Sequence, residues 1–205
     1  MPERVQLQTR LPVGAADTRS LGWWAMIFVV FTEAALFAYL LFSYYYLAVV
    51  VPHTPGTFPL GGPLAVKLAG PNTAILLISS AFVAWAQTGI ERGNKWRLVG
   101  GLGAGALLGT IFLVIQSFEW GNQKFDIPSS AYSSLYYVVT GFHMAHVLVG
   151  VLILMALTVW AAMGYFNRFR YAHIHIGALY WHFVDAVWIA IFFTFYLTPR
   201  LGLMS

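Results

Sequence analysis

Hydrophobic residues in this 205-residue chain gather into five long runs, separated by short polar segments. The runs cover residues 21–50, 71–90, 96–118, 132–165 and 173–198. About 20 consecutive apolar residues let a helix cross a bilayer, whereas a membrane β-barrel would show segments of about ten residues with alternating polarity. The pattern therefore predicts an all-α, polytopic membrane bundle with five transmembrane helices.

The polar segments set the expected domain boundaries. A tail covers residues 1–20, a single five-helix transmembrane domain covers residues 21–198, and a short C-terminal tail covers residues 199–205. A Pro- and Gly-rich loop is expected over residues 52–70, because Pro71, Asn72 and Thr73 form a proline and polar start signal for the second helix. No polar segment is long enough to fold alone.

Composition supports the membrane prediction and excludes several kinds of site. The chain is 60% hydrophobic and 9% charged, whereas soluble domains average about 45–50% and about 25%. It contains no cysteine, which excludes disulfides, thiolate metal sites, iron–sulfur clusters and covalent c-type haem attachment. The first apolar run is too long for the core of a signal peptide, so we expect no cleavable signal.

Basic residues are distributed unevenly between the two sides that five spans create. Eight of the 11 lie in the N-terminal tail and in the loops after the second and fourth helices. The positive-inside rule therefore places the N-terminus in the cytoplasm and the C-terminus outside. Because these charges sit in short loops, they report topology, and we expect no nucleic-acid partner. Tryptophans and tyrosines at the two ends of the first helix put its centre near Ala34.

Two acidic residues fall at membrane depth, where a charge costs at least about 2.5 kcal/mol. Glu33 lies beside the centre of the first helix, and Asp185 lies near the middle of the fifth. Glu33 fits either a proton-handling carboxylate or a neutral, hydrogen-bonded acid that fixes helix packing, and both interpretations stay open. For Asp185 we favour a structural pair with His182, which lies three residues earlier on the same helical face.

The histidines invite a metal or haem interpretation. His143 and His146 share a face of the fourth helix, and His182 faces inward from the fifth. Counted at about 1.5 Å per residue, however, His143 and His182 lie about 12 Å apart along the membrane normal. His173 and His175 lie at the cytoplasmic interface. We therefore expect no metal and no haem on this chain.

Other features of the spans indicate packing. Gly101, Gly105 and Gly109 form a repeated G-x-x-x-G stripe, a surface for close helix approach either within the chain or to a partner. Ser79 and Ser80 have no histidine or lysine placed with them in a recognisable motif, so we expect no catalytic residue.

Five short motifs, in order along the chain, resemble cytochrome c oxidase subunit III of the haem-copper terminal oxidases. The resemblance covers residues 22–197, nearly the whole sequence. The motifs are Thr32-Glu33 in the first span, Asn72-Thr73 opening the second, Gln116-x-x-Glu119-Trp120 closing the third, TGFHMAHVLVG at 140–150 in the fourth and YWHFVDAVW at 180–188 in the fifth.

The resemblance implies an accessory subunit that carries no redox centre. Such a subunit packs against catalytic subunit I, which holds the haems and copper that reduce oxygen to water, beside subunit II and a small subunit IV. Glu33 matches the family's buried carboxylate near the catalytic subunit's proton-uptake route. The resemblance also assigns His143, His146, His182 and Asp185 to family positions in the bundle, where they are proton-related or structural.

Bound phospholipid is also implied by the resemblance. The candidate lipid contacts are Trp23, Trp24, Trp181, Arg168 and Arg170. Many relatives have seven helices, and this chain matches the last five, as in short bacterial forms, which implies a bacterial inner membrane. Longer relatives tend to carry a glutamate at the position of His175, so the role of that acid does not transfer.

The leading hypothesis is subunit III of an aa3-type cytochrome c oxidase, which supports proton uptake and stability during aerobic respiration. A quinol oxidase or nitric oxide reductase-type complex would have a similar subunit. A small channel or transporter would predict broken helices or repeated halves, and the sequence has neither. A bis-histidine b-type cytochrome is a further alternative, which a haem spectrum would reveal.

Overall fold

The computed structural model describes residues 20–50, 58, 64, 66–166 and 171–201, and these residues form helices and short connections without a strand. The helices are α1 (Leu21–Val50), α2 (Val66–Glu91), α3 (Lys95–Gly121), α4 (Ala131–Ala162) and α5 (Ala172–Phe192). A single 3₁₀ turn, η1 (Ile127–Ser129), precedes α4, and a π-helical turn, η2 (Phe193–Leu197), extends α5. All five long helices are apolar enough to cross a membrane, which confirms the predicted fold class.

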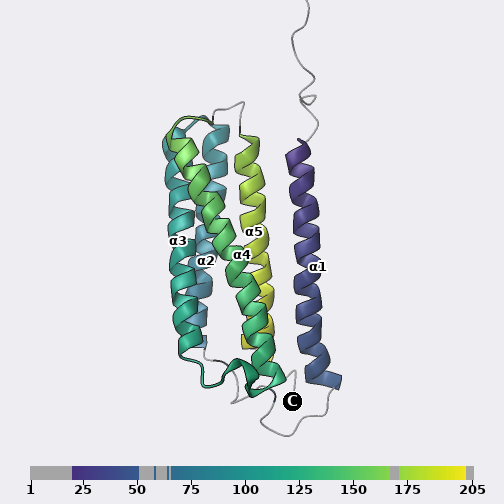
Figure 1. Ribbon diagram of the computed structural model, residues 1–205. Helices are drawn as coiled ribbons and strands as arrows, with labels where there is room; N and C mark the ends of the chain where they lie inside the picture. The colour runs from purple at the N-terminus through teal and green to yellow at the C-terminus, as the bar shows by residue number, and fades with distance from the viewer. Residues whose placement is uncertain (1–19, 51–57, 59–63, 65, 167–170, 202–205) are drawn as a thin grey trace, which may run out of the picture.

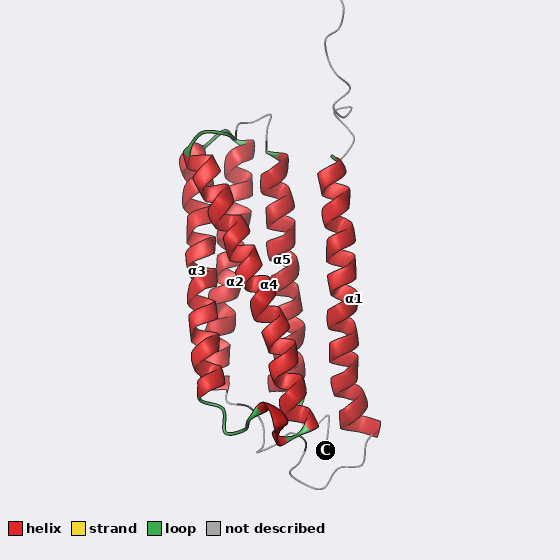
Figure 2. Cartoon of the chain, in the orientation of Figure 1, coloured by secondary structure: helices red, strands yellow, loops and turns green. Residues whose placement is uncertain are grey.

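The helices stand nearly parallel, and each runs opposite to the one before it (Figure 1). Helices α2, α3, α4 and α5 form a bundle, and α1 stands at its edge beside α5 and α4. Figure 2 shows that the described connections gather at the two ends of the bundle. We call the end where α1 begins the N-terminal end and the opposite one the C-terminal end.

The observed helix boundaries agree with the predicted ones except at α2. This helix begins at Val66, so Pro71 lies inside it and does not open it. Proline lacks the main-chain N–H that would bond the Lys67 carbonyl, and its ring crowds that carbonyl, which together cost about 3 kcal/mol inside a helix. The predicted loop over residues 52–70 was wrong for its last residues, which are helical. Among its other positions the structure describes only Phe58 and Leu64.

The glycine stripe of α3 is an interface within the chain. Gly101, Gly105 and Gly109 are buried. A Cβ atom on Gly101 would lie 2.7 Å from the Phe82 carbonyl oxygen of α2, and one on Gly105 would lie 2.7 Å from a methyl group of Val83. A Cβ atom on Gly109 would collide with the Trp181 ring of α5. The stripe therefore lets α3 approach α2 and the large ring from α5 closely.

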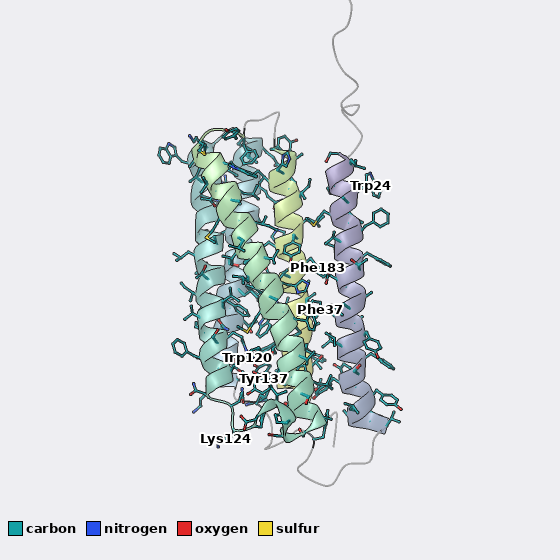
Figure 3. All side chains as sticks on the ribbon, in the orientation of Figure 1. Trp24, Phe37, Trp120, Lys124, Tyr137 and Phe183 are labelled. Carbon is teal, nitrogen blue, oxygen red and sulfur yellow. The ribbon has the colours of Figure 1, made fainter. Side chains whose placement is uncertain are left out.

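Helix α1 is attached far less extensively than the other helices. Only Phe37 and Tyr44 of α1 are fully buried, and Figure 3 shows Phe37 and Phe183 in the space between α1 and the bundle. Near the C-terminal end, the Tyr45 hydroxyl lies 3.1 Å from the Thr194 hydroxyl. Most of the outward surface of α1 is apolar and exposed, with Phe31 73% accessible.

We predict that leucine at Gly101 loosens the α2–α3 interface, whereas leucine at the adjacent Gly100 does not. The Gly101 side chain would meet main-chain atoms, which cannot move aside, and overpacking of this kind costs about 1–3 kcal/mol. Gly100 is exposed, and a Cβ atom placed there would meet no atom within 4 Å. The free energy of unfolding in mixed micelles measures both effects, and equal stability of the two variants would reject the interface.

Candidate functional site

Helices α1 and α4 are joined by a side-chain pair in the middle of the molecule. The Glu33 carboxyl oxygen Oε2 lies 2.9 Å from Nε2 of His146. Both side chains are half-buried, with 31% of Glu33 and 15% of His146 exposed. The Phe37 ring packs edge-on to the imidazole at 5.2 Å. Glu33, the acid of α1 that is costly to place at membrane depth, therefore has its partner on α4.

The pair must hold a proton between its two members. His146 Nδ1 lies 2.6 Å from the Phe142 carbonyl oxygen, and because a carbonyl only accepts, Nδ1 is the donor. The Nε2 atom of a neutral ring is then an acceptor. Its contact with Glu33 requires either a protonated carboxyl group or an imidazolium. In both forms the hydrogen bond has its proton on one of the two facing atoms, Glu33 Oε2 or His146 Nε2.

His143 is separate from this pair. Its ring is fully buried between Phe112 and Trp188, whose centroids lie 5.8 and 4.8 Å away. Nε2 donates to the Val184 carbonyl oxygen at 3.2 Å, and Nδ1 has no hydrogen-bond partner. This imidazole links α4 to the main chain of α5.

The predicted local pair would require His182 to contact Asp185. Instead, the His182 imidazole contacts side chains of α2. Its Nδ1 atom lies 2.5 Å from the Ser80 hydroxyl, and its Nε2 atom lies 3.4 Å from the Gln87 amide oxygen. Asp185 is 4% exposed, and neither carboxyl oxygen has a hydrogen bond. The predicted His182–Asp185 pair is therefore wrong, because the imidazole turns across the helix interface.

Ser80 and His182 are brought together by the fold, although no sequence motif joins them. Their contact does not make a catalytic triad. In a triad the second imidazole nitrogen donates to a carboxylate, whereas here it faces an amide oxygen of Gln87.

Two further residues extend this group toward the N-terminal end. Gln87 Nε2 lies 3.3 Å from Nδ1 of His175, and His175 Nε2 lies 3.6 Å from the Glu91 carboxylate. Sequence reasoning missed Ser80 and Gln87. The available signal was spacing: Ser80 and Gln87 are seven residues apart, as are His175 and His182, which places each pair on one helical face.

A second polar group lies near the C-terminal end, where the sequence suggested packing alone. Glu119 is 5% exposed, and its Oε1 atom accepts a hydrogen bond from the Tyr196 hydroxyl at 2.5 Å. That hydroxyl is 3.3 Å from the hydroxyl of Tyr136. The buried Asn72 donates to Gln116 at 3.4 Å. These contacts join α2, α3, α4 and α5.

The candidate lipid contacts have different surroundings. Trp24 is 52% exposed and packs edge-on to Trp23, so both remain candidates. Trp181 is fully buried, and its indole N–H donates to the Ser79 hydroxyl at 3.1 Å. The expected lipid contact of Trp181 is therefore wrong, because no indole surface is left for a lipid. Arg168 and Arg170 lie outside the described residues.

The described imidazoles already have protein partners. His143, His146, His175 and His182 each contact a main-chain or side-chain group by at least one nitrogen. In the described part of the chain, no three histidine, aspartate or glutamate side chains come together as a metal site would require. Together, the fold and the site define a polytopic α-helical membrane protein whose intramembrane polar groups serve one another.

Comparison with known proteins identifies the family. The family model for cytochrome c oxidase subunit III matches residues 15–199. The chain is 34% identical over 187 residues to cytochrome c oxidase subunit 3 of Synechocystis, covering 90% of this chain and 77% of that protein. It is 31% identical over 179 residues to the subunit 3 of Drosophila yakuba, covering 84% and 68% respectively. The chain belongs to the cytochrome c oxidase subunit III family.

Family membership makes this chain a membrane subunit of an oxidase complex that contains other subunits. Respiration and electron transport follow from the family. The roles of Glu33, His143, His146, His182 and Asp185 in that complex stay predictions.

We predict that Glu33 and His146 are energetically coupled. In a double-mutant cycle of Glu33→Ala and His146→Ala, the coupling in the free energy of unfolding should be about 0.6–2 kcal/mol, as for other interhelical hydrogen bonds in membranes. A matched cycle of Glu33→Ala with His175→Ala, which contacts α2 instead, should give no coupling. Equal coupling in both cycles would contradict the pair.

Proposed function

We propose that this chain is the accessory, non-redox subunit III of an aa3-type cytochrome c oxidase. It packs against catalytic subunit I, beside subunit II and a small subunit IV, and supports proton uptake and durability during oxygen reduction. Haem and copper belong to the partner subunits. The observation that carries the proposal is the proton-holding pair of Glu33 and His146 between α1 and α4.

The hydrogen-bond partners of the imidazole nitrogens support the proposal that this chain holds no redox centre. A haem-ligating histidine needs a free nitrogen aimed at the iron, with the other nitrogen held by an orienting partner. Both nitrogens of His146 and both of His182 are committed to protein groups. His143 keeps an unpaired Nδ1 atom, but its ring is enclosed by those of Phe112 and Trp188. Binding iron or copper at His146 or His182 would break contacts that hold α1 and α2 in place.

The proton-related part is supported by the exposure and chemistry of Glu33. Its side chain stays 31% accessible on the edge of the bundle, so a partner subunit or a lipid can reach it. The proton that it shares with His146 can move between the two groups without leaving a bare charge in lipid. A carboxyl group of this kind can lend a proton to an adjoining uptake route and recover it.

The outward surface of α1 supports the packing proposal. It exposes a row of large apolar residues that lipid and partner subunits can cover: Phe28, Phe31, Tyr39, Phe42 and Tyr46. Trp23 and Trp24 lie at the N-terminal end, where tryptophans favour the headgroup region. The uneven basic residues favour a cytoplasmic N-terminus, an outside C-terminus and a bacterial inner membrane. We further propose one transmembrane domain, residues 21–198, between two short tails.

A quinol oxidase or a nitric oxide reductase-type complex would use a similar subunit. The electron donor binds other subunits, so copper-ligating cysteines in the neighbouring subunit II would favour cytochrome c. The polypeptides that co-purify with this chain in mild detergent therefore distinguish these complexes.

We predict that Glu33→Ala leaves the haem content of the purified complex unchanged but impairs proton coupling or shortens its active lifetime during turnover. The reason is that the variant removes a shared proton site and the polar link to α1, but no haem ligand. Haem absorbance, proton release per electron and activity during sustained turnover measure the three properties.

Thr32→Ala is the matched control for this variant. Thr32 is the neighbouring residue of α1 and is exposed, and its hydroxyl donates to Val29 of its own helix. It should behave as the unaltered complex does. Loss of haem in Glu33→Ala, or normal coupling together with a normal active lifetime, would overturn the accessory role proposed for Glu33.

A further inference from the structure

Polar side chains form a line between α2 and α5, from the N-terminal end of the bundle to its buried middle. The line begins at Glu91, whose side chain is 51% exposed, and leads to Asp185, which is 4% exposed. Along α5, Asp185 lies ten residues beyond His175, which is about 15 Å at about 1.5 Å per residue. In order, its members are Glu91, His175, Gln87, His182 and Ser80. Asp185 lies beyond them, three residues after His182 on the same face of α5, and neither of its carboxyl oxygens has a hydrogen-bond partner.

The hydrogen-bond donors along this line can all point the same way, from Asp185 toward Glu91. The amide N–H of Gln87 donates to Nδ1 of His175, so the Nε2–H group of a neutral His175 faces Glu91. The amide oxygen of Gln87 accepts from Nε2–H of His182, so Nδ1 of His182 accepts from the Ser80 hydroxyl. The Ser80 oxygen is then free to accept, and a protonated Asp185 is the donor that would complete the line.

We propose that Asp185 is a buried protonation site that exchanges its proton with the N-terminal end of the bundle through this line. In one transfer, Asp185 gives up a proton. Each intervening group accepts one proton and donates another, and Glu91 or the water beyond it gains a proton. Ser80 and both imidazoles can accept and donate at once. Gln87 is the control point, because an amide passes a proton only through its imidic-acid form or by turning its side chain.

The other described titratable groups of the bundle do not offer Asp185 a different partner. On α1 and α4, Glu33 and His146 bind each other, and His143 donates to the Val184 carbonyl. On α3, Glu119 accepts from Tyr196. Among the described residues the line thus ends at Asp185, so it delivers protons to one site. The inference does not depend on the proposed oxidase role, because its chemistry lies within this chain.

The test is the exchange of the Asp185 carboxyl proton for deuterium, followed by infrared spectroscopy on the full chain in lipid nanodiscs or within its complex. A carbonyl stretch of a protonated carboxyl group should disappear in Asp185→Asn, which assigns it. After transfer into D₂O this band should shift rapidly in the unaltered chain. In Gln87→Leu the shift should be slower by about tenfold or more, because exchange must wait for local opening of the helices.

Two further variants test whether slower deuterium exchange at Asp185 results from interruption of the polar line. Gln87→Glu restores a group that both accepts and donates, so it should keep exchange rapid, and Ser80→Ala should slow exchange as Gln87→Leu does. Gln123→Leu is the matched control, because this half-buried amide donates to Tyr136 at the other end of the bundle; it should leave the rate unchanged. Circular dichroism confirms that each variant is folded. Absence of a band assigned to Asp185, or unchanged exchange in folded Gln87→Leu and Ser80→Ala, would overturn the proposal.

Discussion

The structure depends on one constraint: a polar side chain inside the membrane must find its partner within the protein. Lipid offers neither hydrogen bonds nor counter-ions, so an unpaired acid there costs several kcal/mol, about 2.5 or more on insertion scales. Glu33 is satisfied by His146, Glu119 by Tyr196, and His182 by Ser80 and Gln87. Each contact joins two helices. The polar residues therefore decide which helix faces overlap, which apolar residues alone would leave undetermined.

Small residues make this arrangement possible by bringing the helices together. Gly101 and Gly105 let α3 approach α2, and Gly109 and Gly150 accept the flat ring of Trp181 between α3 and α4. The Trp181 indole N–H in turn reaches Ser79. Among the described residues, helix α1 has no such glycine contact with α4 and relies on the Glu33–His146 pair and on aromatic packing at Phe37 and Tyr44. The link between α1 and the bundle thus depends on few side chains.

Much of the fold, but little of the site, could be predicted from sequence. Long apolar runs determined the number and type of helices, and the cost of burying charge singled out Glu33 and Asp185. Depth along a helix can be counted, and it placed Glu33 near the membrane centre. It could not say that α1 neighbours α4, because lateral order depends on packing between distant segments. Ser80 and Gln87 were missed because a lone serine or amide in a span resembles ordinary packing until its partner is known.

The central claim is that intramembrane polar side chains of this subunit serve protein groups on neighbouring helices, with Glu33 paired with His146 and His182 with Ser80. An electron cryo-microscopy structure of the intact oxidase complex tests it most directly. The expected result is continuous side-chain density between Glu33 and His146, with His182 directed at Ser80. Density for a metal ion or a haem coordinated by His143, His146 or His182, or a Glu33 side chain turned away from α4, would contradict it.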